Sequence, residues 1–176
     1  MVLTPNKDTS IYQENSSRSG GSGSQLYAGR TCGTGGTTNR RALVAFEISG
    51  IPTNATIDSV SLQINYDKRS FQNSSSHSFS VHKVLNNWNE GGSFGGGQGS
   101  AAQTNDATWS HRLFNVSTWN TSGGDFVGAA SDTETFGGNS FGFKTWASSQ
   151  MIADVQSWLD NPGTNFGWLL KGAESA

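Results

Sequence analysis

The sequence is poor in the residues and motifs that mark several large classes of protein. It contains one cysteine, Cys32, so no disulfide within the chain can stabilise the fold. It has no run of 18 apolar residues, which argues against a transmembrane helix. Charged residues make up only 14% of the chain, and 11 basic against 13 acidic side chains leave a net charge of −2. Because no basic patch is evident, we expect neither nucleic acid nor membrane as a partner.

Catalytic motifs are also lacking. The three histidines are scattered without the spacing of a metal site, and no Gly-x-Ser-x-Gly elbow occurs. The CGTGG stretch at Cys32 has no following Gly-Lys-Ser/Thr, so it does not predict a phosphate-binding loop. Glu90 and Asp106 flank a long loop, but sequence alone cannot place them at the separation that a glycosidase requires. We therefore predict that the protein is not an enzyme.

The length of 176 residues suits one domain with a substantial core, and we predict a single domain over residues 1–176. The first residues, MVLTPNKDTS, lack the apolar centre of a signal peptide. We expect either that a leader has been removed, or that the protein leaves its host by lysis or within a particle.

Alternating apolar positions predict strands. Two runs, Ala42 to Ser49 and Val60 to Asp67, alternate with period two and are separated by a Ser-Gly-Ile-Pro turn. Further strands are expected at 24–29, around Phe79 and Val81, at 140–146 and at 165–172. Abundant glycine and small polar residues fit an all-β protein with many turns. We predict a jelly-roll-like β-sandwich.

One amphipathic helix is predicted at about residues 148–160, before the last strand. Its apolar stripe consists of Met151, Ile152, Val155, Trp158 and Leu159. A serine at 148 or 149 can cap its start, and an Asn-Pro-Gly sequence ends it. Asp154 and Gln156 are expected on its polar face.

A glycine-rich stretch at 89–109 predicts a long loop, which is usually functional or ordered by a partner or an ion. Trp88 and Trp109 bracket it. We predict that these two and Trp119 are candidates for stacking on a ligand such as a sugar. Trp158 lies on the helix stripe and Trp168 on the last strand, so both are assigned to the core.

A structural Ca²⁺ is a further hypothesis, because carboxylates and loop carbonyls are the ligands that calcium prefers. Asp8 and Asp106 are the candidate ligands, although no EF-hand pattern is present. The alternative is that such residues form hydrogen-bonded turns.

The doubled arginine, Arg40 and Arg41, opens a strand and must point to its two opposite faces. An arginine at a strand end can bind a carboxylate bidentately and close the core, with Glu90 or Asp154 as candidate partners. Binding of an anionic ligand is the alternative, and we favour the structural role.

Seven segments, in order, resemble the DNRLRE (disaggregatase-related) domain family, a β-sandwich similar to carbohydrate-binding jelly rolls. They are NKDTSIYQEN, RRALVAFEISGIPTNATIDSVSLQI, VHKVLNNWNEG, NDATW, GGDF, MIADVQSWLDNPGTNFGWLLKG and Glu174. The resemblance implies a secreted or surface-displayed, non-catalytic module attached to polysaccharide-active or adhesive proteins. Some family members bind acidic polysaccharides.

Members of that family usually continue with a basic stretch and a closing strand, and we expect this closing strand to be absent here. A missing strand would leave an open edge for a neighbouring chain to cover. Our main hypothesis is therefore a homo-oligomeric or larger extracellular assembly, with the protein as a capsid decoration (cement) or fibre protein at a virion surface. The alternative is a secreted carbohydrate-binding module that recognises a polysaccharide.

Overall fold

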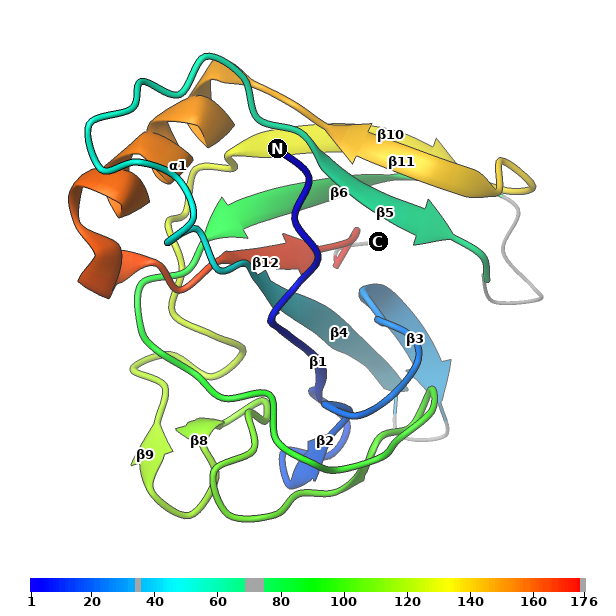
Figure 1. The fold of residues 1–176 in the computed structure, drawn as a ribbon. Coiled ribbons are helices and arrows are strands. Elements are labelled where there is room, and N and C mark those ends of the chain that lie inside the picture. The colour runs from blue at the N-terminus through cyan, green and yellow to red at the C-terminus, as the bar shows by residue number, and fades with distance from the viewer. Residues whose placement is uncertain (34–35, 69–74, 175–176) are drawn as a thin grey trace.

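A computed structural model describes residues 1–33, 36–68 and 75–174, and most of its regular backbone is antiparallel β-structure (Figure 1). The main sheet contains eight strands: β1 (Lys7–Tyr12), β2 (Arg18–Ser19), β3 (Gly29–Gly33), β4 (Gly36–Ala45), β6 (Ser76–Lys83), β7 (Ser100–Ala101), β10 (Asp132–Gly137) and β12 (Trp168–Lys171). Two smaller pairs are β5 (Leu62–Tyr66) with β11 (Gly142–Trp146), and β8 (His111–Leu113) with β9 (Ser117–Thr118).

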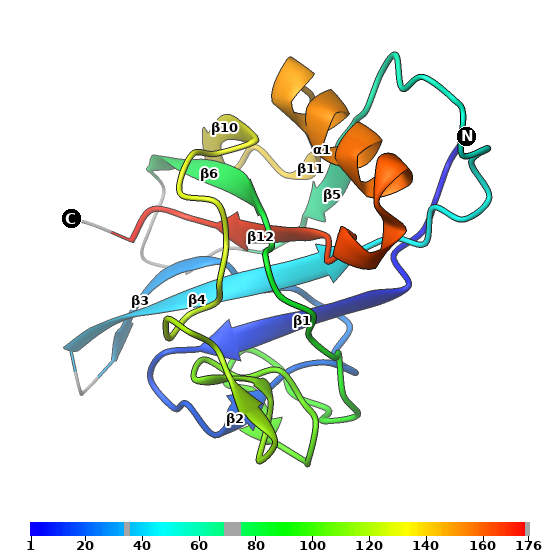
Figure 2. The ribbon, with the colours of Figure 1, turned by 90° about the vertical axis from the view of Figure 1, so that its left-hand side faces the viewer.

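The main sheet is ordered β10-β6-β12-β4-β1-β2-β7, and β3 pairs with the first half of β4. Strand β12, late in the chain, lies between β4 and β6 and is antiparallel to both (Figure 2). Its backbone is therefore paired on both sides, so β12 is not an edge strand. The predicted absence of a closing strand stays a prediction. Strand β12 itself offers no unpaired edge to a neighbouring chain, because β4 and β6 occupy both of its sides.

The central strand β4 is buried on both faces over its last four residues, 42–45, because an apolar layer covers each side of the sheet there. Ala42 and Val44 belong to one hydrophobic cluster, whereas Leu43 and Ala45 belong to another. The period-two alternation of a strand divides neighbouring residues between the two faces in this way. Strands buried on both faces read as continuous apolar runs, as this segment does.

The first apolar layer is made by α1 and the β5–β11 pair, which lie together at the top of Figure 1. Among the described residues, the one α-helix is α1 (Ser149–Asp160), and it is followed by the short 3₁₀ helix η1 (Pro162–Thr164). Ser148 caps α1, since its side chain accepts a hydrogen bond from the amide of Met151 at 3.1 Å. No helix in this part of the chain is long and apolar enough to cross a bilayer.

The second apolar layer is made by irregular segments between residues 84 and 126, which include β8 and β9 at the lower end of Figure 1. It covers β1, β4 and β12 on the face opposite α1. The hydrophobic cluster that this layer forms together with the sheet has these buried members: Ile11, Leu43, Ala45, Val84, Trp88, Ala107, Trp109, Trp119 and Leu169. Loops that supply such large side chains to a core are fixed by that packing.

The structure confirms the all-β fold with one short helix before the last described strand. The predicted helix, 148–160, matches α1 closely, but Asp154 is buried rather than on the polar face. Its carboxylate accepts hydrogen bonds from Ser131 Oγ at 2.5 Å and from Trp168 Nε1 at 3.0 Å. A buried carboxylate is tolerated when donors satisfy it in this way.

The strand predicted at 24–29 is wrong, because residues 24–28 are irregular and β3 begins only at Gly29. The amide of Tyr27 donates to the side chain of Ser10 at 2.8 Å rather than to a neighbouring strand. The predicted strand from Ala42 also ends earlier than expected, at Ala45, and the turn after it does not form a hairpin with β5. Strand β5 instead pairs with β11, outside the main sheet.

Candidate functional site

A hollow on the surface, which we call the polar hollow, is formed by the segment after β6 and the segments around β8 and β9. Its volume is about 460 Å³, within the range of small-ligand sites. Most side chains around it carry amides, hydroxyls or charges: Asn86, Arg112, Val116, Ser117, Thr118, Asn120 and Asp125. This concentration of hydrogen-bonding groups makes it our principal candidate site.

Asp125 connects the segments that border the polar hollow. Its carboxylate accepts hydrogen bonds from Asn86 Nδ2 at 2.8 Å, from the amide of Asn120 at 2.9 Å and from the amide of Thr121 at 2.9 Å. Asp125 is buried, and its carboxylate is occupied by these donors. Its role is therefore to orient the other residues that line the polar hollow, which we call the rim. Contact with a ligand is left to the side chains of Asn86, Asn120 and their neighbours.

Arg112 provides the positive charge of the polar hollow. Its Nη1 donates to the carbonyl of Asn87 at 3.2 Å, and it forms no ion pair with any other residue that the structure describes. A guanidinium carries five N–H donors, so further donors remain for a ligand. Thr118 and Asn120 are exposed beside it, on either side of the buried Trp119.

The three tryptophans predicted as a stacking platform are not available to a ligand in this structure. Trp88, Trp109 and Trp119 are 1%, 8% and 4% exposed. The structure corrects their assignment because their ring faces are covered within the second apolar layer. Trp119 Nε1 donates to Thr108 O at 2.9 Å, and Trp88 Nε1 donates to Phe166 O at 2.8 Å. These tryptophans therefore hold the loops that build the polar hollow.

Trp158 and Trp168, which the sequence assigned to the core, are both buried, and their ring centroids are 4.6 Å apart. The exposed aromatic side chains are phenylalanines instead. Phe143 and Phe94 are 72% and 73% exposed. Phe143 lies on the outer face of β11, directly opposite Asn65 of β5, and is the main aromatic alternative to the polar hollow.

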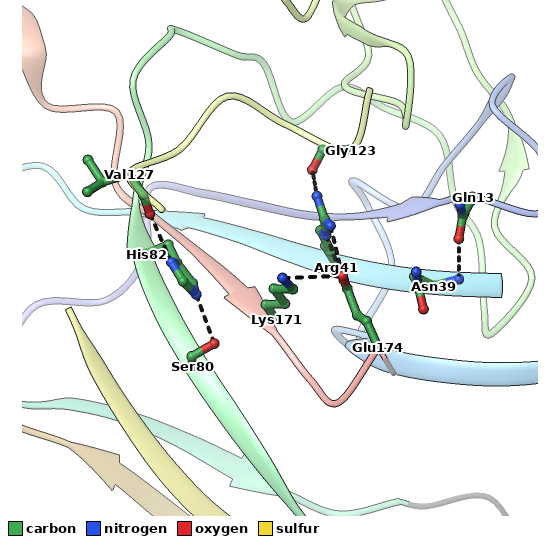
Figure 3. Close-up of polar contacts among 9 residues, drawn as sticks. All are labelled: Gln13, Asn39, Arg41, Ser80, His82, Gly123, Val127, Lys171 and Glu174. Atoms are coloured by element: carbon green, nitrogen blue, oxygen red, sulfur yellow. Dashed lines mark hydrogen bonds and ion pairs between the residues drawn. The ribbon is translucent and has the colours of Figure 1, made fainter. Parts of the chain in front are cut away.

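A polar network on the main sheet holds the loop that carries Asp125 (Figure 3). Arg41 of β4 donates through Nε and Nη2 to the two carboxylate oxygens of Glu174, at 2.7 and 2.8 Å. Its Nη1 donates to the carbonyl of Gly123 at 2.7 Å. Lys171 of β12 forms a second ion pair with Glu174, with an N···O distance of 3.5 Å. The bidentate geometry makes Arg41 a rigid link between the sheet and this loop.

His82 of β6 makes a second link to the same loop (Figure 3). Its Nδ1 lies 2.9 Å from the carbonyl of Val127, and its Nε2 lies 2.8 Å from Ser80 Oγ. A carbonyl can only accept, so Nδ1 carries the proton, and Nε2 accepts from the Ser80 hydroxyl in the neutral ring. Burial lowers the pKa of His82, and nearby Lys171 and Arg41 lower it further, although the bond to Val127 opposes this shift.

The partners suggested by the sequence for the two arginines, Glu90 and Asp154, are wrong. Arg40 forms an ion pair with Glu14, and its Nε lies 2.7 Å from Glu14 Oε1. Its guanidinium carbon lies 5.4 Å from the centroid of the Tyr12 ring. The carboxylate that binds Arg41 is 133 residues away in the chain, which explains why local sequence did not reveal it.

Glu90, predicted as a structural partner of an arginine, instead lies near Asp8, a candidate calcium ligand. Burial raises the pKa of Asp8, and burial together with the Asp8 carboxylate raises the pKa of Glu90. Beside them, the Lys7 ammonium donates to Asn87 Oδ1 at 3.1 Å and to Trp88 O at 2.7 Å. Burial lowers the pKa of Lys7, although Glu90 opposes this shift. Two neighbouring oxygens, Asn87 Oδ1 and Trp88 O, are thus engaged by an ammonium.

Asp106, the second candidate calcium ligand, orders the glycine-rich loop directly. Its carboxylate accepts from the amide of Gln103 at 2.9 Å, from the amide of Gly92 at 3.3 Å and from the Ser93 hydroxyl. Gly91 packs so closely that a Cβ there would lie 1.8 Å from Asp106 Oδ1. Within residues 1–33, 36–68 and 75–174, no cluster of three or more His, Cys, Asp or Glu side chains could hold a metal. The calcium site stays a prediction.

Sequence reasoning missed the polar side chains that line the hollow, of which Asn86 and Arg112 are half-buried and Thr118 and Asn120 are exposed. They lie in irregular segments or in the short strands β8 and β9, where no hydrophobic period marks them. The signal available was compositional, since several asparagines, serines and threonines follow one another between residues 115 and 122. Such a run also fits an ordinary surface loop.

One comparison with known proteins gives a match. The family described as carbohydrate-binding module family 96 matches residues 1–94, slightly more than half of the chain. The matched part contains strands β1 to β6 and the first residue of the polar hollow, Asn86. No curated protein and no solved structure matches the chain.

Proposed function

Because the chain belongs to carbohydrate-binding module family 96, we propose that it is a single, non-catalytic module that binds a polysaccharide in the polar hollow. The observation that carries this location is the concave arrangement of Asn86, Arg112, Thr118 and Asn120 over the buried Asp125. The buried carboxylate fixes the rim through three hydrogen bonds before a ligand arrives. A preorganised rim reduces the entropy that is lost on binding.

The chemistry of the rim suits sugar hydroxyls, which donate and accept hydrogen bonds at the same atom. Asparagine amides supply both donors and acceptors, threonine supplies a hydroxyl, and arginine supplies several donors. The exposed side chain of Val116 adds an apolar surface for the C–H face of a sugar ring. Arg112 and the buried Asp125 bring opposite charges to the lining, so the hollow itself does not select between neutral and acidic polysaccharides, and the screen includes both.

The family match favours the alternative that the sequence left open, a polysaccharide-binding module. It gives no support to the main hypothesis of a capsid decoration or fibre protein, nor to an oligomeric assembly. We propose that the module acts outside the cell, where its polymeric ligands occur. Its specific kinship with the DNRLRE domains stays a prediction.

The test is to map the ligand by NMR. A panel of soluble neutral and acidic polysaccharides is first screened by affinity electrophoresis, and a short oligosaccharide of the retained polymer is then titrated into ¹⁵N-labelled protein. We expect the side-chain amides of Asn86 and Asn120 and the backbone amide of Thr118 to shift together. Asn65 of β5, an exposed asparagine opposite Phe143 of β11, serves as the matched control. Shifts at Asn65 without shifts at Asn120 would move the site to the outer face of β5–β11.

A further inference from the structure

A second hollow lies between the end of α1 with η1 and the segment that follows β4. Its volume is about 300 Å³. Its lining differs from that of the polar hollow because it combines apolar walls with a few polar atoms. We propose that this second hollow binds one neutral, hydroxyl-bearing sugar unit, such as the end of a polysaccharide chain.

Two buried polar atoms without partners belong to residues that line this hollow. Trp158 is 2% exposed, and its indole Nε1 has no hydrogen-bond partner among the described residues. Asn165 donates through Nδ2 to the carbonyl of Phe46 at 2.9 Å, whereas its buried Oδ1 has no partner within the same set of residues. A buried donor or acceptor left without a partner costs about 1–3 kcal/mol. Such atoms call for an explanation, because native proteins satisfy nearly all of them.

Four of the other five buried tryptophans share one pattern of hydrogen bonding at the indole. Trp88, Trp119, Trp146 and Trp168 each donate Nε1 to a carbonyl or carboxylate oxygen at 2.8–3.0 Å. Trp158 is instead the tryptophan whose fully buried Nε1 has no partner among the described residues, and it lines the second hollow. A hollow beside an unsatisfied N–H is the arrangement expected of a site that a ligand completes.

The two atoms have complementary needs, since Nε1 must donate and Oδ1 must accept. A hydroxyl group can accept from the Trp158 indole and donate to the Asn165 amide oxygen. A carboxylate or phosphate would satisfy only the indole, and an ammonium only the amide oxygen. The required ligand group is therefore a hydroxyl or another group that both donates and accepts.

The other residues that line the second hollow favour a ligand with both apolar and polar faces, such as a sugar. Phe46, Ile48 and Leu159 give an apolar surface, while Lys7 and Glu47 bring opposite charges to the lining. Opposite charges leave no strong preference for an ionic ligand. A pyranose presents C–H faces and a rim of hydroxyls, which matches a mixed lining of this kind. The choice of a sugar as the hydroxyl-bearing ligand rests on the proposed function.

The experiment follows the indole N–H of Trp158 directly by NMR. Methyl α- and β-glycosides of glucose, mannose and galactose are titrated into the ¹⁵N-labelled protein, and the Trp158 signal is assigned from its loss in W158F. We expect one of these glycosides to shift that signal in a saturable manner and to slow its hydrogen exchange. The indole signals of Trp119 and Trp146 should stay in place and act as internal controls.

A blocking variant makes the result specific. Thr53 is exposed at the lining, so Thr53→Trp should fill the hollow without disturbing the core and should abolish the shift at Trp158. Thr56→Trp, an equally exposed position outside the lining, should leave it unchanged. If no glycoside moves the Trp158 signal while polymer binding persists, a bound water satisfies the indole and the proposal is overturned. If the signal moves but no polymer binds, the second site stands and the polar hollow fails.

Discussion

Replacement of Arg41 by methionine tests how much stability this guanidinium provides by binding both the Glu174 carboxylate and the loop of the polar hollow. Methionine keeps much of the length of the side chain and removes the guanidinium. The substitution deletes the bidentate bond to Glu174 and the bond to the carbonyl of Gly123. It also removes a cation that lies 4.8 Å from the centroid of the Trp109 ring.

The expected loss of stability in R41M follows from the burial of the ion pair between Arg41 and Glu174. The side chains of Arg41 and Glu174 are 11% and 12% exposed, so removal of the arginine leaves a largely buried carboxylate. Loss of one partner of a buried pair costs about 3–5 kcal/mol. Lys171 remains 3.5 Å from Glu174 and compensates in part. We therefore expect R41M to lower the free energy of unfolding by about 2–4 kcal/mol.

Urea unfolding monitored by tryptophan fluorescence measures this loss. An unchanged m-value shows that the variant exposes the same amount of surface on unfolding. The double variant R41M/E174M should recover at least about 1 kcal/mol, because it removes the unpaired carboxylate as well. A loss below about 0.5 kcal/mol in R41M would refute the reasoning. So would a double variant that is no more stable than R41M.

Three other perturbations test separate parts of the structure. G91A should lower the thermal midpoint by several degrees, because its Cβ would clash with Asp106 and φ is +78°; an unchanged midpoint would refute this packing. Because burial lowers the pKa of folded His82, the unfolded state takes up its proton first, and stability should fall as pH drops below about 6.5. H82Q should flatten this slope in urea unfolding between pH 7.5 and 6, and an equal slope would exclude His82. The donors around Asp106 predict that EDTA leaves the thermal midpoint unchanged, whereas a lower midpoint in EDTA would support the predicted calcium site.

The elements predicted best from the sequence were those with a clear hydrophobic period. Helix α1 and strands β5 and β12 fall within two or three residues of their expected limits. Strand β1 was missed because Thr9 and Ser10 at its centre are buried polar residues, which conceal the alternation. Burial of hydroxyls between a sheet and its covering loops depends on tertiary packing, which a local pattern does not contain.

The candidate site was predicted less well, and for two physical reasons. The tryptophans that suggested a binding platform lie in loops, and loops usually lie at the surface, but here these side chains form the second apolar layer. The links that hold the polar hollow join distant parts of the chain, such as Arg41 with Glu174. Neither the direction of a loop side chain nor a contact across 133 residues leaves a periodic signal.

The measurement that tests the central claim most directly compares two arginine variants in their affinity for the polysaccharide selected by the screen. Arg112 lines the polar hollow, whereas Arg30 is an exposed arginine on β3 and serves as a control of equal charge. Loss of charged hydrogen bonds worth about 1.5–3 kcal/mol predicts that R112A binds at least tenfold more weakly in isothermal titration calorimetry. R30A should bind as tightly as the unsubstituted protein. Equal affinities of R112A and R30A would show that the polysaccharide does not bind in the polar hollow.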